Sequence, residues 1–206
     1  PEVHRIILNV GGIANVTNLN PGSITKGFDT GPGNILLDAW VQRHTGRVFD
    51  EDGKWASSGH VIPRLLDALL AHPFLDLAPP KSCGREQFNI DWLESNLVGG
   101  EPAEDVQATL LELSARSIAS AIERWCGKPE ELAVCGGGAH NEMLLRRLSA
   151  LLPRTRIQTS DILGIEADWV EALAFAWLAR QTLHGLPGNL PSVTGARGAR
   201  ILGAIY

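Results

Sequence analysis

Two short strand-like segments of this chain each end in a run of glycines, which indicates a tight turn or a close approach of the backbone to another group. Residues 4–10 (HRIILNV) end at Gly11 and Gly12, and residues 16–19 (VTNL) follow. This pattern predicts two strands joined by a glycine turn. Two interpretations of the turn remain open. It is either a simple hairpin, or a row of backbone N–H groups that cradles a phosphate, which larger side chains would obstruct.

The second glycine run follows residues 131–135 (ELAVC). Gly136, Gly137 and Gly138 come first, then His140 and Asn141, and a helical pattern occupies residues 142–152. A strand, a glycine run and a helix start are typical of nucleotide binding, because glycine allows close approach and the helix N-terminus faces the ligand. The third glycine of G-x-G-x-x-G is missing and no Gly-Lys-Ser/Thr follows, so neither a dinucleotide site nor a P-loop is supported. For His140 we expect a hydrogen-bonded surface position.

One carboxylate, Asp29, lies between glycines in residues 27–34 (GFDTGPGN). A short strand over residues 23–28 leads into it, and an amphipathic helical pattern begins at Asn34. Because proline is favoured in the first turn of a helix, Pro32 places Asp29 on a tight turn beside a helix N-terminus. A carboxylate there can act as a general base. The alternative is an aspartate that only caps the following helix.

Helical patterns follow over residues 34–43, 61–71, 90–97 and 104–125, and the last of these predicts a core-packed scaffold helix. Between the first two, residues 49–54 (FDEDGK) carry three carboxylates. They lack the ligand spacing of an EF-hand, so we expect a solvated turn.

Near the end of the chain, residues 156–159 form a further expected strand, and an alanine-rich helix that looks buried begins at Asp168. Glu171 is the exception in this helix. It either complements the helix dipole or points into the same cleft as Asp29. Residues 201–206 look strand-like.

Composition narrows the partners. The 206 residues carry a net charge of −5 and no Lys/Arg cluster, which argues against nucleic acid or an acidic membrane surface and favours a small molecule. Cys83, Cys126 and Cys135 are far apart, so neither a zinc site nor a disulfide framework is suggested, and a reducing cytoplasm fits. No apolar run approaches the roughly 18 residues of a membrane helix. The chain begins with Pro1 and enters a strand at once, so we expect a piece of a longer protein.

Five linked motifs closely resemble the anhydro-N-acetylmuramic acid kinase family across essentially all 206 residues. They are residues 9–17 (NVGGIANVT), 27–34 (GFDTGPGN), 80–89 (PKSCGREQFN), 135–141 (CGGGAHN) and 171–176 (EALAFA). Cys83 departs from the family pattern, in which K-S-T-G-R-E has threonine. Cys83 has no sequence neighbour that would activate it, so we expect a packed or idle thiol rather than a nucleophile.

The resemblance implies an α/β fold of the actin/hexokinase/Hsp70 type: an actin-like ATPase (ribonuclease H-like) lobe, with a mixed sheet flanked by helices. Such kinases carry an N-terminal glycine-rich phosphate hairpin, G-T-S-x-D-G in this family, and this chain does not contain it. We therefore expect residues 1–206 to be the C-terminal lobe and interdomain segment of a two-lobed sugar kinase. The N-terminal lobe is absent from this chain, so the isolated fragment is expected to be inactive.

The implied reaction belongs to peptidoglycan recycling. ATP phosphorylates O6 of the amino sugar 1,6-anhydro-N-acetylmuramic acid while water opens the anhydro bridge, giving N-acetylmuramic acid 6-phosphate. By resemblance Asp29 is the general base, Gly11 and Gly12 lie against the phosphates, and Glu171 is a weaker sugar contact. The adenosine would contact Gly136, Gly137, Gly138 and Asn141. Mg²⁺ would bridge the phosphates largely through water, with no protein metal ligands assigned. The family also implies a cytoplasmic enzyme and a possible homodimer.

Three alternatives stay open. Another kinase or ATPase of the superfamily would share the nucleotide glycines but not the motifs at residues 27–34 and 80–86. A non-catalytic nucleotide-binding lobe would bind ATP without turnover. A structural α/β domain would bind no nucleotide, and ATP would then leave its melting temperature unchanged.

Overall fold

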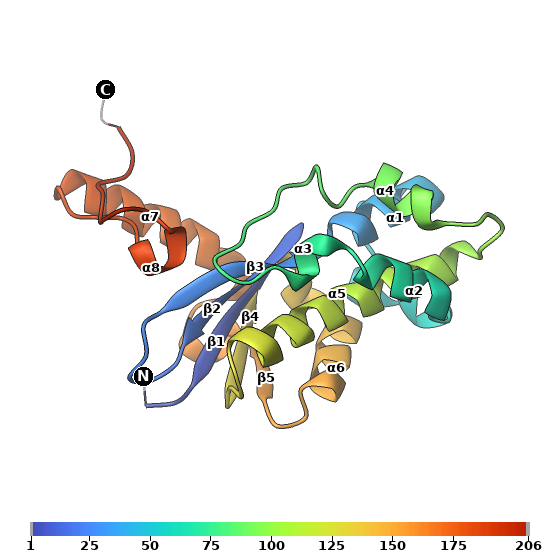
Figure 1. The fold of residues 1–206 in the computed structure, drawn as a ribbon, viewed down its shortest axis with the longest axis horizontal. Helices are drawn as coiled ribbons and strands as arrows, with labels where there is room; N and C mark the ends of the chain where they lie inside the picture. The colour runs from blue at the N-terminus through green and yellow to red at the C-terminus, as the bar shows by residue number, and fades with distance from the viewer. Residues whose placement is uncertain (1, 205–206) are drawn as a thin grey trace.

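The computed structural model describes residues 2–204 (Figure 1). Its strands are β1 (Arg5–Val10), β2 (Ile13–Leu19), β3 (Lys26–Pro32), β4 (Glu131–Cys135) and β5 (Arg156–Thr159). Its α-helices are α1 (Ile35–Thr45), α2 (Pro63–Leu70), α3 (Pro73–Asp76), α4 (Ile90–Asn96), α5 (Ala103–Trp125), α6 (Glu142–Leu151), α7 (Val170–Leu183) and α8 (Pro191–Thr194). Short 3₁₀ helices are η1 (Glu51–Gly53), η2 (Ala56–Ser58), η3 (Gly137–His140), η4 (Ser160–Leu163) and η5 (Ala167–Trp169).

The five strands form one mixed sheet in the order β3-β2-β1-β4-β5. The first three are an antiparallel meander, β4 pairs with β1 in parallel, and β5 pairs with β4 in parallel. In both parallel pairs the connection includes a helix, α5 before β4 and α6 before β5, as a parallel crossover requires. The mixed sheet is confirmed, and so are the strands expected around residues 4–10, 16–19, 131–135 and 156–159. The strand expected over residues 23–28 begins later, at Lys26. The sheet places the carboxyl ends of β1 and β4, and with them both glycine runs, at the same edge.

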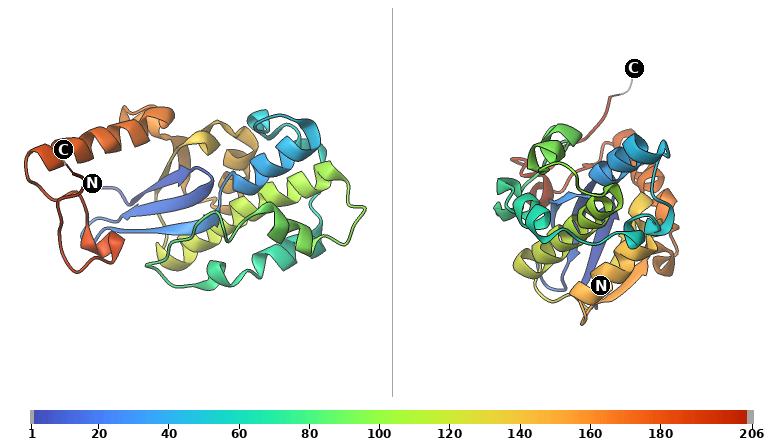
Figure 2. Two further views of the ribbon diagram at one scale, coloured as in Figure 1. Left: turned by 90° about the horizontal axis from the view of Figure 1, so that it is seen from above. Right: turned by 90° about the vertical axis from the view of Figure 1, so that its right-hand side faces the viewer.

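One face of the sheet is covered by α5 and α6 (Figures 1 and 2). Along β1 the side chains of Ile6, Leu8 and Val10 alternate into this layer and are completely buried. They pack against Ile118 and Ile122 of α5. Full burial of such side chains contributes about 1.5–3 kcal/mol each. The sequence prediction of α5 as a core scaffold is therefore confirmed.

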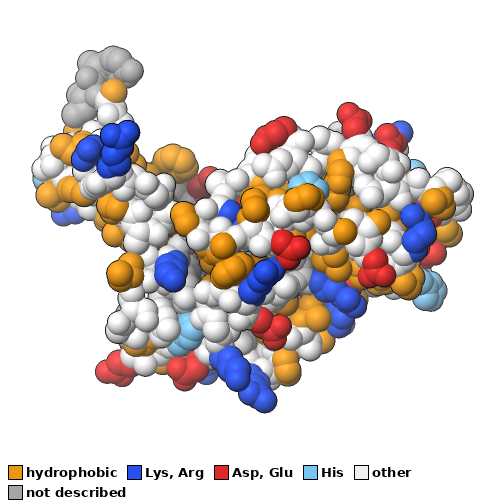
Figure 3. Space-filling model, viewed as in Figure 1, with side chains coloured by type: hydrophobic (Ala, Val, Ile, Leu, Met, Phe, Trp, Pro, Cys, Tyr) orange, Lys and Arg blue, Asp and Glu red, His pale blue; other side chains and the backbone are white. Residues whose placement is uncertain are grey.

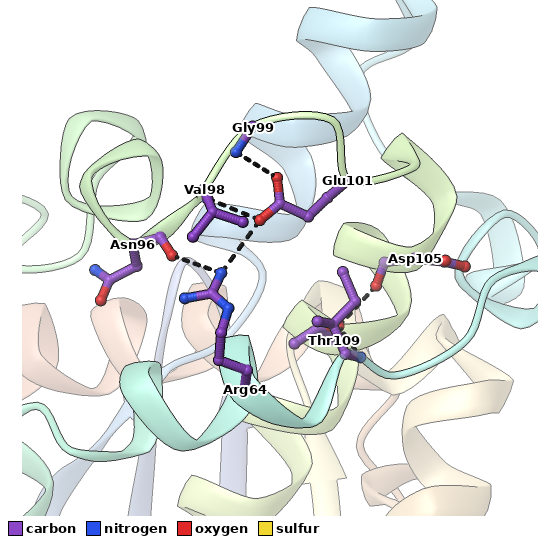
Figure 4. A network of polar contacts seen from close by, with 8 residues as sticks. Arg64, Asn96, Val98, Gly99, Glu101, Asp105 and Thr109 are labelled. Atoms are coloured by element: carbon purple, nitrogen blue, oxygen red, sulfur yellow. Dashed lines mark hydrogen bonds and ion pairs between the residues drawn. The ribbon is translucent and has the colours of Figure 1, made fainter.

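A second apolar cluster joins α1, α2 and α4 to the first half of α5. The α4–α5 loop is fixed by polar contacts (Figure 4). Glu101 accepts hydrogen bonds from the backbone N–H groups of Val98 and Gly99 and pairs with Arg64 of α2 at 3.2 Å. The hydrogen bond from the Val98 backbone N–H is the largest of the contributions that hold the pKa of the Glu101 carboxyl below its usual value. The loop and α2 are thus tied to the start of α5.

The start of α1 differs from the sequence prediction. Pro32 is the last residue of β3 rather than part of a helical turn, and α1 begins at Ile35 without a side-chain cap. Its first N–H groups instead meet the β1–β2 turn. Asn34 donates to the carbonyl of Gly11 at 2.8 Å, and Ile35 donates to that of Gly12 at 3.1 Å. The backbone of the turn therefore replaces a capping side chain.

The end of the chain also differs from the prediction. The expected helix exists as α7, but none of its residues is buried, and it extends away from the sheet (Figure 1). Apolar side chains such as Phe175 and Trp177 are 64% and 49% exposed, and Figure 3 shows apolar atoms over this region. The apolar pattern was misleading because no layer of the described chain covers α7. Residues 201–204 form no strand, and residues 205–206 of that expected strand lie outside the described residues.

None of the helices within residues 2–204 combines the length and apolar character needed to span a membrane.

Candidate functional site

Asp29 lies within β3, not on a turn, and it does not cap α1. In this strand Phe28 and Thr30 are buried toward the helices, so Asp29, between them, faces the opposite side of the sheet. It is paired with Asn15 on β2, beside an irregularity between Ala14 and Asn15. The prediction failed because the glycines around Asp29 allow a bulged strand as readily as a turn.

The Asp29 carboxylate is held by a segment more than 50 residues later in the chain. Its Oδ2 atom accepts hydrogen bonds from the Ser82 hydroxyl at 2.7 Å and from the Cys83 backbone N–H at 2.9 Å. The Asp29 backbone N–H donates to the carbonyl of Lys81 at 3.0 Å. Oδ1 accepts no hydrogen bond from residues 2–204. One oxygen is therefore fixed and the other is available.

The Lys81 side chain ties this segment to α3. Its buried Nζ donates to the carbonyls of Phe74 and Leu75 at 3.0 and 3.2 Å and lies 4.5 Å from the centre of the Phe74 ring. Burial lowers the pKa of Lys81 from its usual value. The contact of Ser82 with Asp29 was not predicted, although the conspicuous P-K-S-x-G-R-E motif was the available signal. The Ser82 hydroxyl holds the Asp29 carboxylate in place through this hydrogen bond.

A cavity of about 550 Å³ opens in front of Asp29. Its polar lining comes from Asn15 and Thr17 of β2, Asp29 of β3 and Ser82. Val193 and Thr194 of α8 form another wall. The cavity is large enough for a sugar-sized ligand, since small-molecule sites usually measure about 300–1,000 Å³.

Cys83 also belongs to this site, because its backbone N–H donates to Asp29 Oδ2. Burial, with a further contribution from the Asp29 charge, raises the pKa of its thiol to about 12. The thiol is therefore protonated at neutral pH and is a poor nucleophile. The expectation of a packed thiol is confirmed. Cys83, Cys126 and Cys135 are all unpaired.

The two glycine runs meet, as the parallel pairing of β1 and β4 requires. A Cβ at Gly136 would collide with Asn9, and one at Gly138 would overlap the Val10 side chain. These two glycines are therefore needed for close packing against β1. A Cβ at Gly137 would have only Asn34 Nδ2 nearby, at 3.7 Å, and Gly11 and Gly12 have comparable space. These three positions leave room for a ligand to approach the backbone.

A second cavity, of about 400 Å³, begins at this junction. Gly137, His140 and Asn141 form one wall, where Asn141 caps α6 by accepting from the Leu144 N–H at 3.0 Å. The opposite walls are Asn34, which precedes α1, Leu37 and Asp38 of α1, and residues 49–52. The N-terminus of α6 thus faces the cavity, across from the carboxylates of Asp38 and residues 50–52.

Asp38 is the most perturbed carboxyl group of this second cavity. Burial raises its pKa from 3.8 to about 6. Its carboxylate accepts no hydrogen bond from residues 2–204. The neighbouring acids differ, since Asp50 accepts from the backbone N–H groups of Trp55 and Ala56.

Other predicted positions behave differently. His140 is exposed and hydrogen-bonded to Asp168 at 2.8 Å, as predicted. Glu171 is exposed on α7 and does not line the Asp29 cavity, so the structure does not bring it together with Asp29. Asp52 pairs with Lys54 at 2.8 Å in the solvated turn. Within residues 2–204, no three His, Cys, Asp or Glu side chains converge as a metal site.

Comparison with a solved structure supports the fold. The activator of the 2-hydroxyisocaproyl-CoA dehydratase from Clostridium difficile, solved with bound ADPNP, aligns with a TM-score of 0.52 at 18% sequence identity. The alignment covers 91% of this chain and 65% of that protein. With the strand order described above, it confirms the expected α/β fold, a mixed sheet flanked by helices.

Comparisons at the sequence level are closer. Anhydro-N-acetylmuramic acid kinases of Thiobacillus denitrificans and Nitrosomonas europaea are 59% and 55% identical over all of this chain, and that of Bordetella pertussis is 54% identical over 98% of it. The chain spans 54–56% of the length of these relatives. The family model for anhydro-N-acetylmuramic acid kinase matches residues 1–206. This chain therefore belongs to the anhydro-N-acetylmuramic acid kinase family.

Proposed function

We propose that this chain is the C-terminal lobe and interdomain segment of a two-lobed kinase that uses ATP to convert 1,6-anhydro-N-acetylmuramic acid into N-acetylmuramic acid 6-phosphate. An N-terminal lobe with the first phosphate-binding hairpin comes from sequence outside this chain. The proposal is supported by the family match and by relatives that are nearly twice as long. From the family resemblance we also propose a cytoplasmic location for the reaction and a homodimeric enzyme.

The observation that carries this function is the arrangement of Asp29. Its Oδ2 is fixed by Ser82 and Cys83, and its Oδ1 is available at a cavity of sugar size. In the proposed step, Oδ1 takes a proton from a water molecule as the water oxygen bonds to C1 of the sugar. The C1–O6 bond breaks, and O6 bonds to the γ-phosphorus while the bond to the ADP oxygen breaks. A positioned base of this kind contributes about 10²–10⁴-fold in rate.

ATP would lie along the edge where the two glycine runs meet. Gly11 and Gly12 offer space for the phosphates at the β1–β2 turn, and Gly137 and Asn141 form the adenosine side. Gly136 and Gly138 support that wall by their packing on β1. Mg²⁺, when bound, would neutralise phosphate charge. Since residues 2–204 contain no convergent ligand group, we propose that it is held mainly by the phosphates and water. Glu171 on α7 remains a weaker proposal for a sugar contact.

The test is ADP release by the full-length protein with Mg-ATP, measured with and without 1,6-anhydro-N-acetylmuramic acid. We expect release that depends on the sugar and is lost in Asp29→Asn. The matched control is Asp67→Asn, since Asp67 is exposed on α2 outside both cavities. ATP binding without sugar-dependent release would instead indicate a non-catalytic nucleotide-binding lobe.

A further inference from the structure

The second cavity has one feature that the proposed reaction does not use. Asp38 is half-buried in its wall, with a pKa raised by burial and no hydrogen-bond donor among residues 2–204. A carboxylate without donors in such a place is costly, and it gains most when a ligand supplies hydroxyl or amine hydrogens. Its neighbours are already occupied, since Asp50 bonds two backbone N–H groups and Asp52 pairs with Lys54.

The position of Asp38 identifies which part of a nucleotide it would meet. Asn34 is bonded to the glycine turn, where the phosphates are placed, and Asp38 lies one helical turn further along α1. Four residues of helix correspond to about 6 Å. A ribose follows the α-phosphate at about that spacing. The ribose also carries two neighbouring hydroxyl groups, the pair of donors that an acidic side chain binds in other nucleotide sites.

The remaining walls fit a nucleoside. Phe49, which is 59% exposed, provides apolar surface against which a base can pack, and Leu37 lines the cavity although it is almost completely buried. Aromatic rings stabilise bases that stack on them. Asn141 uses its side-chain oxygen to cap α6, which leaves its amide N–H groups for the ligand.

We propose that Asp38 is a specificity-determining residue that accepts hydrogen bonds from the 2′- and 3′-hydroxyl groups of ATP, so that the site selects ribonucleotides over deoxyribonucleotides. This inference rests on the proposed function, because it assumes that ATP occupies the second cavity. It adds a role for a residue on α1 that neither the glycine runs nor the Asp29 cavity contains. The ligand class is a ribonucleoside triphosphate.

The test is equilibrium binding of ATP, 2′-deoxy-ATP and 3′-deoxy-ATP to the full-length protein by titration calorimetry without sugar. We expect the wild type to bind at least one deoxy analogue about tenfold or more weakly than ATP, as loss of a hydrogen bond to a charged group predicts. Asp38→Asn should bind ATP more weakly and lose most of this preference. The control Asp67→Asn should keep it, and thermal melting without ligand shows whether each variant is folded.

A measurement on the wild type alone covers the case in which Asp38→Asn does not fold. The preference for ATP should shrink below about pH 6, where Asp38 becomes protonated. The other titratable groups lining the cavity are Asp50, Glu51, Asp52 and His140, and the first three carry the partners described above or lie beside Lys54. Equal affinity for all three nucleotides at pH 8 would overturn the inference while leaving the kinase function intact. Absence of ATP binding would overturn both.

Discussion

The two cavities hold their carboxylates in opposite ways. Asp29 is fixed on a strand, with two donors on one oxygen, whereas Asp38 sits on a helix and receives no donor from residues 2–204. A group that takes a proton must keep one oxygen at a set position, and a group that recognises a ligand must keep its acceptors free. The difference fits the roles proposed above, a general base for Asp29 and a ligand contact for Asp38.

The largest difference should appear between a variant that lacks the Asp29 carboxylate and one that lacks the Asp38 carboxylate. Asp29→Asn should lower kcat by about 10²–10⁴-fold and change the Kd for ATP little, because the general base is lost and the nucleotide walls remain. Asp38→Asn should show the reverse pattern, with a raised Kd and a nearly unchanged kcat at saturating ATP. Steady-state ADP release and calorimetry measure both. A similar loss of kcat in the two variants would contradict the division of roles.

The next largest effect is expected at two neighbouring glycines after β4, Gly137 and Gly138. Gly138→Ala should lower the free energy of unfolding by about 1–3 kcal/mol, because its Cβ would overlap Val10 in a packed core. Gly137→Ala should leave stability nearly unchanged and weaken ATP binding, since that position faces the cavity. Urea unfolding of the two full-length variants measures the contrast. Equal destabilisation would show that both glycines serve packing.

A smaller effect on kcat is expected at Ser82, whose hydroxyl donates to Asp29. Ser82→Ala should lower kcat roughly tenfold, because one of two hydrogen bonds to Asp29 Oδ2 is lost, with the Kd for ATP unchanged. Ser82→Thr keeps the hydroxyl and should restore most of the rate. If Ser82→Thr were as slow as Ser82→Ala, the hydroxyl would not be the group that matters.

The smallest effect is expected at Cys83. Because its pKa is raised to about 12, the thiol stays protonated through neutral pH and loses its proton only as the pH rises toward that value. Iodoacetamide at pH 7.5 should therefore label Cys83 slowly, as read by mass spectrometry of the folded protein. Cys83→Thr should keep kcat within about twofold, since only its backbone N–H contacts Asp29.

Much of the fold could be predicted from the sequence because its signals are local. The β-branched run that forms β1 and the apolar spacing of α5 depend on near neighbours, and both elements lie where they were expected. The contact between Ser82 and Asp29 joins residues 53 positions apart, and no local pattern encodes it. Asp29 itself was identified by its motif, but its place in a strand depends on pairing with β2.

Burial was the least predictable property. The apolar pattern of α7 led to an expectation of a core helix, yet burial depends on which other surfaces are present, and none covers this helix within the described chain. Asp38 shows the converse case. It lies on the polar side of an ordinary amphipathic pattern, and only the fold brings Gly137 and residues 49–52 around it.

The shared hydrogen bonds between the β1–β2 turn and the start of α1 have a consequence for local opening. The carbonyls of Gly11 and Gly12 accept hydrogen bonds from the N–H groups of Gly33, Asn34 and Ile35. The β1–β2 turn and the start of α1 can therefore only open together. Their amides should exchange with solvent deuterium as one unit. A nucleotide whose phosphates engage the turn would then slow exchange at helix amides that it never touches.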